Sequence, residues 1–532
     1  MRLRPTYLLV AALGVLALSS ASAQTASPPG SCGNISALQA TVTQKPQNVE
    51  ALVQLGEAQL CLGRLQKSRV LLEAAQDNLE NATNLDGNNF NAGFLLGQVY
   101  FELGDLDAAA EEFTRLSKVA PERAEAFYQL GVVQARLRKP DEAIGAFRKA
   151  AELAKNNRLE ANFQRDVNVA LAGQLLQKKD FAGAAAVYKA AQEFSPNDTD
   201  LQIGEAQAWF NAERNAEALE VVNRILAKNR GHVAATWLVA SIYEKQGASG
   251  RERAVRELTR SLSVVSAPKD RAVLLLKRGL IESAQGRSDA ALETLRQSVA
   301  NDGTLFESRY AYAVALLAGS KPNPKAAFEQ YRAADKLRPN DGEVQLGLAS
   351  TQSQLGNYSA AYQNAQNAAR LLATEPARVA AARYIAGRSA YLAAIANPAS
   401  GAEWLRRATL EFRALVAQDT GNSEYRYWLG LTLLQRKEYT SAIESLIEAI
   451  KISPGNLELR VALSAAYIGA KRFSDAETVA RAVVKAAPNN ADAWFNLGLA
   501  LLNQSRNAEG KKALQTAARL GNQAAATLLK KL

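Results

Sequence analysis

Small residues return along this chain at steps close to 34 residues, and this periodicity constrains the fold more than any other feature. Six of the twelve successive steps are of 34 residues, and the others are longer by two to nine. In eleven of the thirteen repeated units, a second small residue follows the first by twelve positions. The first set is Gly56, Gly97, Gly131, Ala172, Ala206, Ala240, Gly279, Ala315, Ala349, Gly387, Gly430, Ser464 and Gly498.

Each unit has the pattern of two short helices that cross closely where the side chains are small. Large apolar residues flank the crossing points at helical spacing, such as Leu130 with Phe147 and Leu429 with Leu446. Turn residues such as Gly104-Asp105 separate the two halves of a unit. Proline ends the second helix twelve residues after the second small residue in five units, at Pro121, Pro196, Pro339, Pro454 and Pro488. The pattern predicts an all-α array of about thirteen antiparallel helix pairs.

The last full unit carries the residues of a known repeat. Trp494, Leu497, Gly498 and Leu501 are followed by Gly510, Leu514 and Ala517, and this pattern resembles the tetratricopeptide repeat. The unit with Leu96-Gly97, Tyr100, Ala109, Phe113 and Pro121 is similar. The resemblance implies a right-handed superhelical solenoid over residues 46–521. Sel1-like and HEAT-like helical arrays are the alternatives, and their usual periods fit the 34-residue step less well.

Some segments depart from the regular unit. Residues 76–89, 155–165 and 393–404 lengthen helices or connections, and we expect them to change the surface locally. The unit at 306–338 has a poor turn signal in Lys321-Pro322-Asn323-Pro324.

The two ends of the chain have their own patterns. Residues 1–23 read as a signal peptide, with Arg2 and Arg4 before an apolar run of about a dozen residues and a cleavage site at Ala21-Ser22-Ala23. Residues 24–45 are predicted to form an N-terminal segment with a capping helix, and residues 522–532 a C-terminal capping helix, because an open solenoid end would expose an apolar face. The predictions are export to the periplasm or the extracellular space and no transmembrane segment in the mature chain.

The predicted export bears on whether the two cysteines form a disulfide. An oxidising compartment permits a bridge, and Cys32 and Cys61 allow only one intramolecular pairing. In an antiparallel arrangement the start of one helix lies level with the end of the next, which favours a disulfide across the N-terminal cap. Two unpaired, half-buried thiols are the alternative.

The composition leaves little room for catalysis. One His and two Cys exclude a His-rich or Cys-only metal site, and the repeats leave no spare domain. No phosphate loop, dinucleotide fingerprint, nucleophile elbow or zinc-protease motif is present in the sequence. The only histidine, His232, lies in a connection between units, where it is expected to cap a helix or face solvent. We therefore predict no catalytic residue, no cofactor and no metal site.

The resemblance places a binding groove along the first helix of each unit. Carried over position by position, the candidate lining residues are mostly aromatic, which is typical of binding hot spots: Phe94, Phe101, Tyr128, Phe210, Trp237, Tyr312, Tyr384, Arg388, Tyr391, Tyr427 and Phe495. We expect about half of the rings to pack as core. The Lys–Asn clamp that some members of the family use for a terminal carboxylate has no counterpart here, although Lys277 and Arg388 could serve as isolated anchors.

These features predict a non-catalytic scaffold of the cell envelope that binds an extended or helical polypeptide in an aromatic-lined groove. A carbohydrate-binding or polysaccharide-secretion factor is the alternative, because aromatic faces also stack on sugar rings. The net charge of +11 slightly favours acidic partners. The basic residues are dispersed rather than clustered, so nucleic acid is not predicted as a partner.

Overall fold

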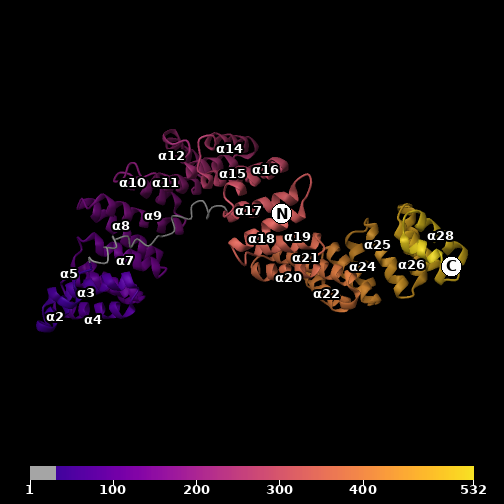
Figure 1. Cartoon of the computed structure of the whole chain (residues 1–532), viewed down its shortest axis with the longest axis horizontal. Coiled ribbons are helices and arrows are strands. Elements are labelled where there is room, and N and C mark those ends of the chain that lie inside the picture. The colour runs from indigo at the N-terminus through magenta and orange to yellow at the C-terminus, as the bar shows by residue number, and fades with distance from the viewer. Residues whose placement is uncertain (1–31) are drawn as a thin grey trace. The chain divides into compact units, whose positions relative to one another are not determined.

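The computed structural model describes residues 32–532, so the predicted signal peptide and residues 24–31 lie outside the described residues. Across residues 32–532 the chain forms 28 α-helices, α2 to α29, with one short 3₁₀ helix and no strand. The chain divides into two compact units, an N-terminal unit that ends at Gln285 and a C-terminal unit that begins at Gly286. In each unit, consecutive helices lie side by side (Figure 1). The prediction of an all-α solenoid of helix pairs is confirmed.

The N-terminal unit begins with the single helix α2 (Ile35–Gln44) and continues in pairs. The pairs are α3 (Val49–Gln66) with α4 (Arg69–Leu85), α5 (Phe90–Leu103) with α6 (Leu106–Val119), α7 (Ala124–Arg136) with α8 (Pro140–Asn156), α9 (Ala161–Gln177) with α10 (Phe181–Ala191), α11 (Thr199–Asn211) with α12 (Asn215–Lys228) and α13 (Val233–Lys245) with α14 (Gly247–Leu262). Helix α15 (Pro268–Ala284) ends the unit.

The C-terminal unit begins with α16 (Ser288–Asn301) and ends with the short helix α29 (Gln523–Leu529). Its pairs are α17 (Phe306–Ala318) with α18 (Pro324–Leu337), α19 (Gly342–Gln354) with α20 (Tyr358–Leu371), α21 (Pro376–Ala396) with α22 (Gly401–Gln418), α23 (Ser423–Gln435) with α24 (Tyr439–Ile452), α25 (Leu457–Gly469) with α26 (Phe473–Ala486) and α27 (Ala491–Asn503) with α28 (Asn507–Arg519). Twelve complete pairs therefore lie within the units, and α15 and α16 hold the sequence of the remaining repeat.

The small residue of the first helix makes room for a large side chain of the second helix. A Cβ atom built on Gly97 would lie 2.7 Å from the ring of Phe113, and one on Gly387 would lie 2.8 Å from the ring of Phe412. Both rings are fully buried. In the unit of Gly97, Phe113 stands one turn after the second small residue, Ala109. The side-chain atoms nearest to Gly97 are therefore those of Phe113 and not those of Ala109.

Asparagine and aspartate side chains start many of the helices. Asn89 accepts a hydrogen bond from the backbone N–H of Ala92 at 3.0 Å, and Asn490 does the same for Ala493 at 2.8 Å. The weak turn signal at 321–324 proves to be a regular helix start, because Asn323 caps α18 and Pro324 takes its first position.

The predicted insertions mostly lengthen helices. Helices α4, α8 and α9 each have 17 residues, whereas most of the described helices have 13 or 14. The insertion at 393–404 extends α21 to 21 residues, and the 3₁₀ helix Pro398–Ser400 then leads into α22.

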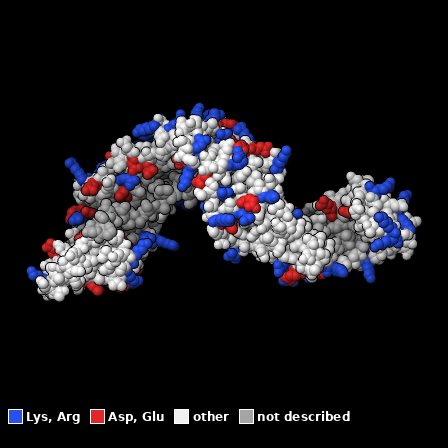
Figure 2. All heavy atoms as spheres, viewed as in Figure 1, with Lys and Arg blue, Asp and Glu red and all other residues white. Residues whose placement is uncertain are grey.

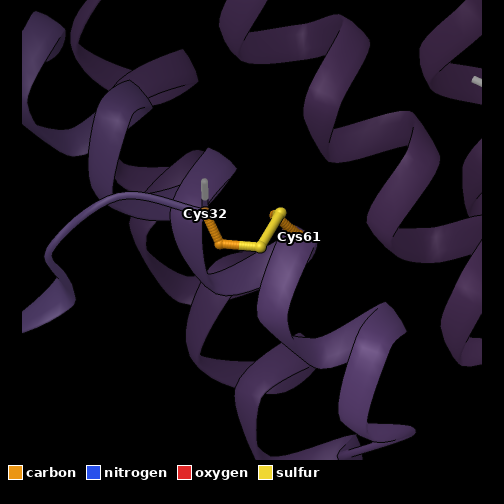
Figure 3. Close-up of a disulfide and its surroundings, with 2 residues drawn as sticks. All are labelled: Cys32 and Cys61. Atoms are coloured by element: carbon orange, nitrogen blue, oxygen red, sulfur yellow. A yellow bond between two sulfur atoms is a disulfide. The ribbon is translucent and has the colours of Figure 1, made fainter. Parts of the chain in front are cut away.

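A disulfide closes the N-terminal end, as the sequence predicted. Cys32 precedes α2 and Cys61 lies near the end of α3, and their sulfur atoms are bonded with the Cα atoms 5.5 Å apart (Figure 3). The bridge encloses α2 and most of α3 in one covalent loop.

Charge is distributed unequally between the two units. Residues 32–285 contain 31 basic and 31 acidic residues, whereas residues 286–532 contain 30 and 21, which is a net charge of +9. In Figure 2, Lys and Arg side chains predominate near the C-terminal end of the chain. None of the described helices is long and apolar enough to cross a membrane.

Candidate binding surface on the first helices

The eleven predicted groove residues all lie on first helices, by which we mean the earlier helix of each pair. Ten of them are aromatic and stand either three residues before or four residues after the small residue of their unit. These two positions are seven residues apart, so they share one stripe of the helix. We call this stripe, together with the positions one and five residues after the small residue, the first-helix stripe.

Three of the predicted residues are closed off from solvent. Tyr128, Phe210 and Trp237, all in the N-terminal unit, are only 7%, 6% and 7% exposed. Burial raises the pKa of the Tyr128 hydroxyl to about 12. These three rings belong to the core. They are therefore not part of a solvent-exposed binding surface.

Four of the predicted residues come together in the C-terminal unit, where α21 and α23 lie next to each other. Tyr384, Arg388 and Tyr391 follow one another along α21, and Tyr427 faces them from α23. Trp428 lies at the centre, with its ring centroid 5.6 Å from that of Tyr391 and 5.8 Å from that of Tyr427. We call these five residues the aromatic cluster.

Hydrogen bonds fix the position of the Tyr384 ring. Its hydroxyl accepts a hydrogen bond from the indole N–H of Trp428 at 3.1 Å and donates one to Glu424. Burial and the Glu424 carboxylate raise the pKa of Tyr384 to about 12, so the hydroxyl remains protonated at neutral pH. The indole ring of Trp428 also stacks on the buried ring of Phe412, which connects the cluster to the core.

Arg388 covers the cluster from the solvent side. Its guanidinium lies 5.0 Å from the ring centroid of Trp428 and 5.7 Å from that of Tyr384. The other two cations of α21 have acidic partners, Glu343 for Arg378 and Glu411 for Arg383. Among residues 32–532, no carboxylate lies within 4.0 Å of the Arg388 nitrogen atoms, and these atoms donate no hydrogen bond. Its N–H groups are therefore available to a ligand.

Sequence reasoning missed Trp428, because this residue stands two positions before Gly430 and lies outside the expected stripe. A usable signal was present. Tyr425, Tyr427 and Trp428 place three aromatic residues within four positions, a density that one helix stripe cannot accommodate. Aromatic side chains that do not fit one stripe must face a neighbouring helix.

The remaining predicted residues are half-buried and lie apart from the cluster. In the N-terminal unit, Phe94 lies against Phe90 at 5.6 Å between ring centroids, and Arg136 lies over Phe101 at 5.4 Å. In the C-terminal unit, Tyr312 and Phe495 pack against core residues near their own helices.

Lys277 does not have the role of an isolated anchor. It is 7% exposed, its Nζ atom lies 2.8 Å from an oxygen of Glu244, and it lies 5.1 Å from the ring centroid of Trp237. Its charge is already paired, which corrects the expectation from the sequence.

His232 caps a helix, as expected. Its Nδ1 atom accepts a hydrogen bond from the backbone N–H of Ala235 at 3.3 Å, at the start of α13. Burial lowers the pKa of the imidazole, which keeps the accepting nitrogen unprotonated.

Comparison with known proteins agrees with the repeat. Two family models, both described as tetratricopeptide repeat, match the chain. One matches residues 94–158, 276–342, 405–456 and 461–525, and the other residues 175–242 and 433–487. A comparison with curated proteins finds no matching relative.

Several solved structures resemble the chain at low identity. They include yeast Tom70, at 14% identity over 92% of this chain and 96% of that chain with a TM-score of 0.30. YrrB, described as a TPR protein with an unusual peptide-binding site, matches at 20% identity over 38% of this chain and 97% of its own, with a TM-score of 0.30. The Cut9 and Hcn1 complex matches at 17% identity over 88% and 92%, with a TM-score of 0.34. Because the repeat models together cover more than half of the sequence, the chain belongs to the tetratricopeptide repeat family, whose members are protein–protein interaction scaffolds.

Proposed function

We propose that this chain is a non-catalytic scaffold that binds an extended or helical polypeptide along its first helices, with the aromatic cluster of α21 and α23 as the principal contact. The cluster carries the proposal, because it combines several half-buried rings with a cation, Arg388, that has no acidic partner among residues 32–532. Large rings held in place by the fold give much contact area at low cost in side-chain entropy.

The cluster is prepared for binding before a ligand arrives. Tyr384 is held by two hydrogen bonds, and Trp428 is stacked on Phe412. Tyr391 and Tyr427 remain half-buried and flank the indole. A ligand side chain that covers these two rings would displace water from apolar surface without reordering the helix.

We place this scaffold in the cell envelope. Two observations support the location: the leader-like pattern of residues 1–23 and the disulfide between Cys32 and Cys61. Disulfides persist mainly in oxidising compartments such as the periplasm and the extracellular space.

Site-specific photo-crosslinking in the producing cell tests the proposal. A crosslinker replaces Tyr427 on a first helix or, as the matched control, Tyr362, a half-buried tyrosine on the second helix α20. We expect polypeptide adducts from position 427, their loss when Tyr391 is changed to Ala, and none from position 362. Equal adducts from both positions, or adducts to glycan alone, would overturn the proposal.

A further inference from the structure

The first-helix stripe carries three cations whose charge the protein itself leaves unpaired. They are Arg136 on α7, Lys245 on α13 and Arg388 on α21, and all three are exposed. In the part of the chain that the structure describes, none of them has a carboxylate within 4.0 Å or donates a hydrogen bond. Each nevertheless has a defined place in the fold, because each lies over at least one aromatic ring.

The same geometry occurs twice in the N-terminal unit. Arg136 lies five residues after Gly131 and covers Phe101 of the preceding first helix at 5.4 Å. Lys245 lies five residues after Ala240 and covers Phe210 of the preceding first helix at 4.2 Å. In both cases the ring stands four residues after the small residue of its own unit. A repeated contact of this kind follows from the repeat itself and not from chance arrangement of surface side chains.

Cations that cover rings elsewhere have acidic partners. Arg338 bonds Glu307 at 2.7 Å, Arg407 bonds Glu403 at 2.9 Å, and Arg472 bonds Asp475 at 2.7 Å. These three stand in a connection, on a second helix and before a second helix, respectively. The ring contact alone therefore does not exclude an acidic partner, and the stripe differs because acids are rare in it.

The sequence of the stripe agrees with this pattern. Its four positions over all thirteen units contain only three acids, Glu57, Glu102 and Glu244. Arg64 binds Glu102 and Lys277 binds Glu244, each at 2.8 Å. From Ala124 to the end of the chain the stripe thus offers unpaired positive charge and no unpaired negative charge.

We infer that the polypeptide segments bound along the first helices of each unit are acidic, with Asp or Glu side chains that pair with Arg136 and Lys245 in the N-terminal unit and with Arg388 in the C-terminal unit. Apolar side chains of the ligand cover half-buried rings such as Tyr391 and Tyr427. This inference rests on the proposed function. A single terminal carboxylate could serve only one of the three cations, whereas they stand on three separate helices. A polypeptide can supply both kinds of group, because acidic and apolar residues can alternate along it.

Selection from a phage-displayed library of random peptides on the full, disulfide-bonded chain tests the inference. We compare the chain with a triple variant, Arg136→Gln, Lys245→Gln and Arg388→Gln. The matched control removes three exposed, unpaired cations of second helices, as Arg148→Gln, Lys189→Gln and Arg413→Gln. Both variants lose the same total charge, so only the position of the charge differs.

We expect selected peptides to be enriched in Asp and Glu next to apolar residues. The enrichment in acids should disappear for the first-helix variant and persist for the control. Synthesised winners should lose affinity about tenfold or more with the first-helix variant and less than about twofold with the control, because charge-assisted hydrogen bonds are lost only in the former.

The other outcomes are equally decisive. Peptides enriched in apolar residues without acids would overturn the inference and leave the proposed function standing. Equal losses with both variants would mean that total charge, and not the stripe, attracts acids, which also overturns it. A uronic acid oligosaccharide that displaces the winners at lower concentration would assign the cations to an acidic glycan. No enrichment of any kind would count against the proposed function itself.

Discussion

Trp237 in the N-terminal unit and Tyr384 in the C-terminal unit stand at the same place in their repeats, yet only Tyr384 is accessible. Trp237 is 7% exposed beneath the ammonium group of Lys277, which pairs with Glu244. Tyr384 is half-buried beneath Arg388, which has no acidic partner among the described residues.

One stripe position accounts for the difference. Four residues after the small residue, α13 has Glu244, whereas α21 has Tyr391. The carboxylate draws a cation from the next first helix over the indole and closes the surface. In α21 the phenol of Tyr391 adds a second ring, and the guanidinium of Arg388 remains exposed to solvent. The same repeat therefore gives core or contact surface according to which residue stands beside the ring.

The largest effect that we expect comes from the disulfide, which lies in the N-terminal unit. The double variant Cys32→Ser, Cys61→Ser should lose about 3–4 kcal/mol of stability at the N-terminal end, because the bridge closes a loop with a sequence separation of 29 residues. Contacts in a repeat array are local, so hydrogen exchange should accelerate in α2 to α4. Unchanged exchange there would show that the staple adds nothing, and α27 to α29 serve as the internal control.

The second prediction tests whether the two units share one packing rule. Gly97→Ala should place a methyl group against Phe113, and Gly387→Ala should do so against Phe412. Each variant is expected to lose about 1–3 kcal/mol, because a buried ring has little room to move. Urea denaturation, with hydrogen exchange measured separately in the two units, gives the loss of stability for each variant. A large loss at one site and none at the other would mean that the units are packed differently.

The third prediction compares Lys277, which pairs with Glu244, with Arg388, which has no acidic partner among the described residues. Lys277→Met should cost about 1–2 kcal/mol, because the half-buried carboxylate of Glu244 is left without the buried cation that pairs with it. Arg388→Met should change stability by less than about 0.5 kcal/mol, because no acid in the described part of the chain pairs with it. Thermal denaturation of the two variants compares them. If Arg388→Met proved as costly as Lys277→Met, Arg388 would be a structural residue and the comparison would fail.

The smallest effect concerns the start of α13. Burial lowers the pKa of His232 in the folded chain, so the unfolded chain binds the proton more readily. Stability at this helix start should therefore fall as the pH drops below the ordinary histidine value of about 6.5. Hydrogen exchange of α13 at two pH values measures the change. His232→Asn should keep the cap and remove the pH dependence, and an unchanged dependence would assign it to another group.

Most of the fold could be predicted from the sequence, because small residues at regular intervals mark where the helices of each repeat pack closely. Gly97 and Gly387 mark helix crossings, and Asn89 marks a helix start. The antiparallel order of the helices that carry Cys32 and Cys61 favoured a bridge over two free thiols, and the structure contains the bridge.

The candidate site was only partly predictable, because exposure depends on residues far along the chain. Trp237 and Tyr384 look alike in sequence, and only the partner of Lys277 on α13 shows that one of them is closed. Trp428 lies outside the stripe, and its role became visible only in its contacts with Tyr384 and Phe412.

The disulfide makes the first and the last of the described helices unequal in how readily they open. Residues 32 to 61 form a covalent ring, whereas the seven-residue helix α29 has Ala525 as its only buried residue. Under mechanical tension or exopeptidase digestion, we expect unravelling to begin at α29 and α28.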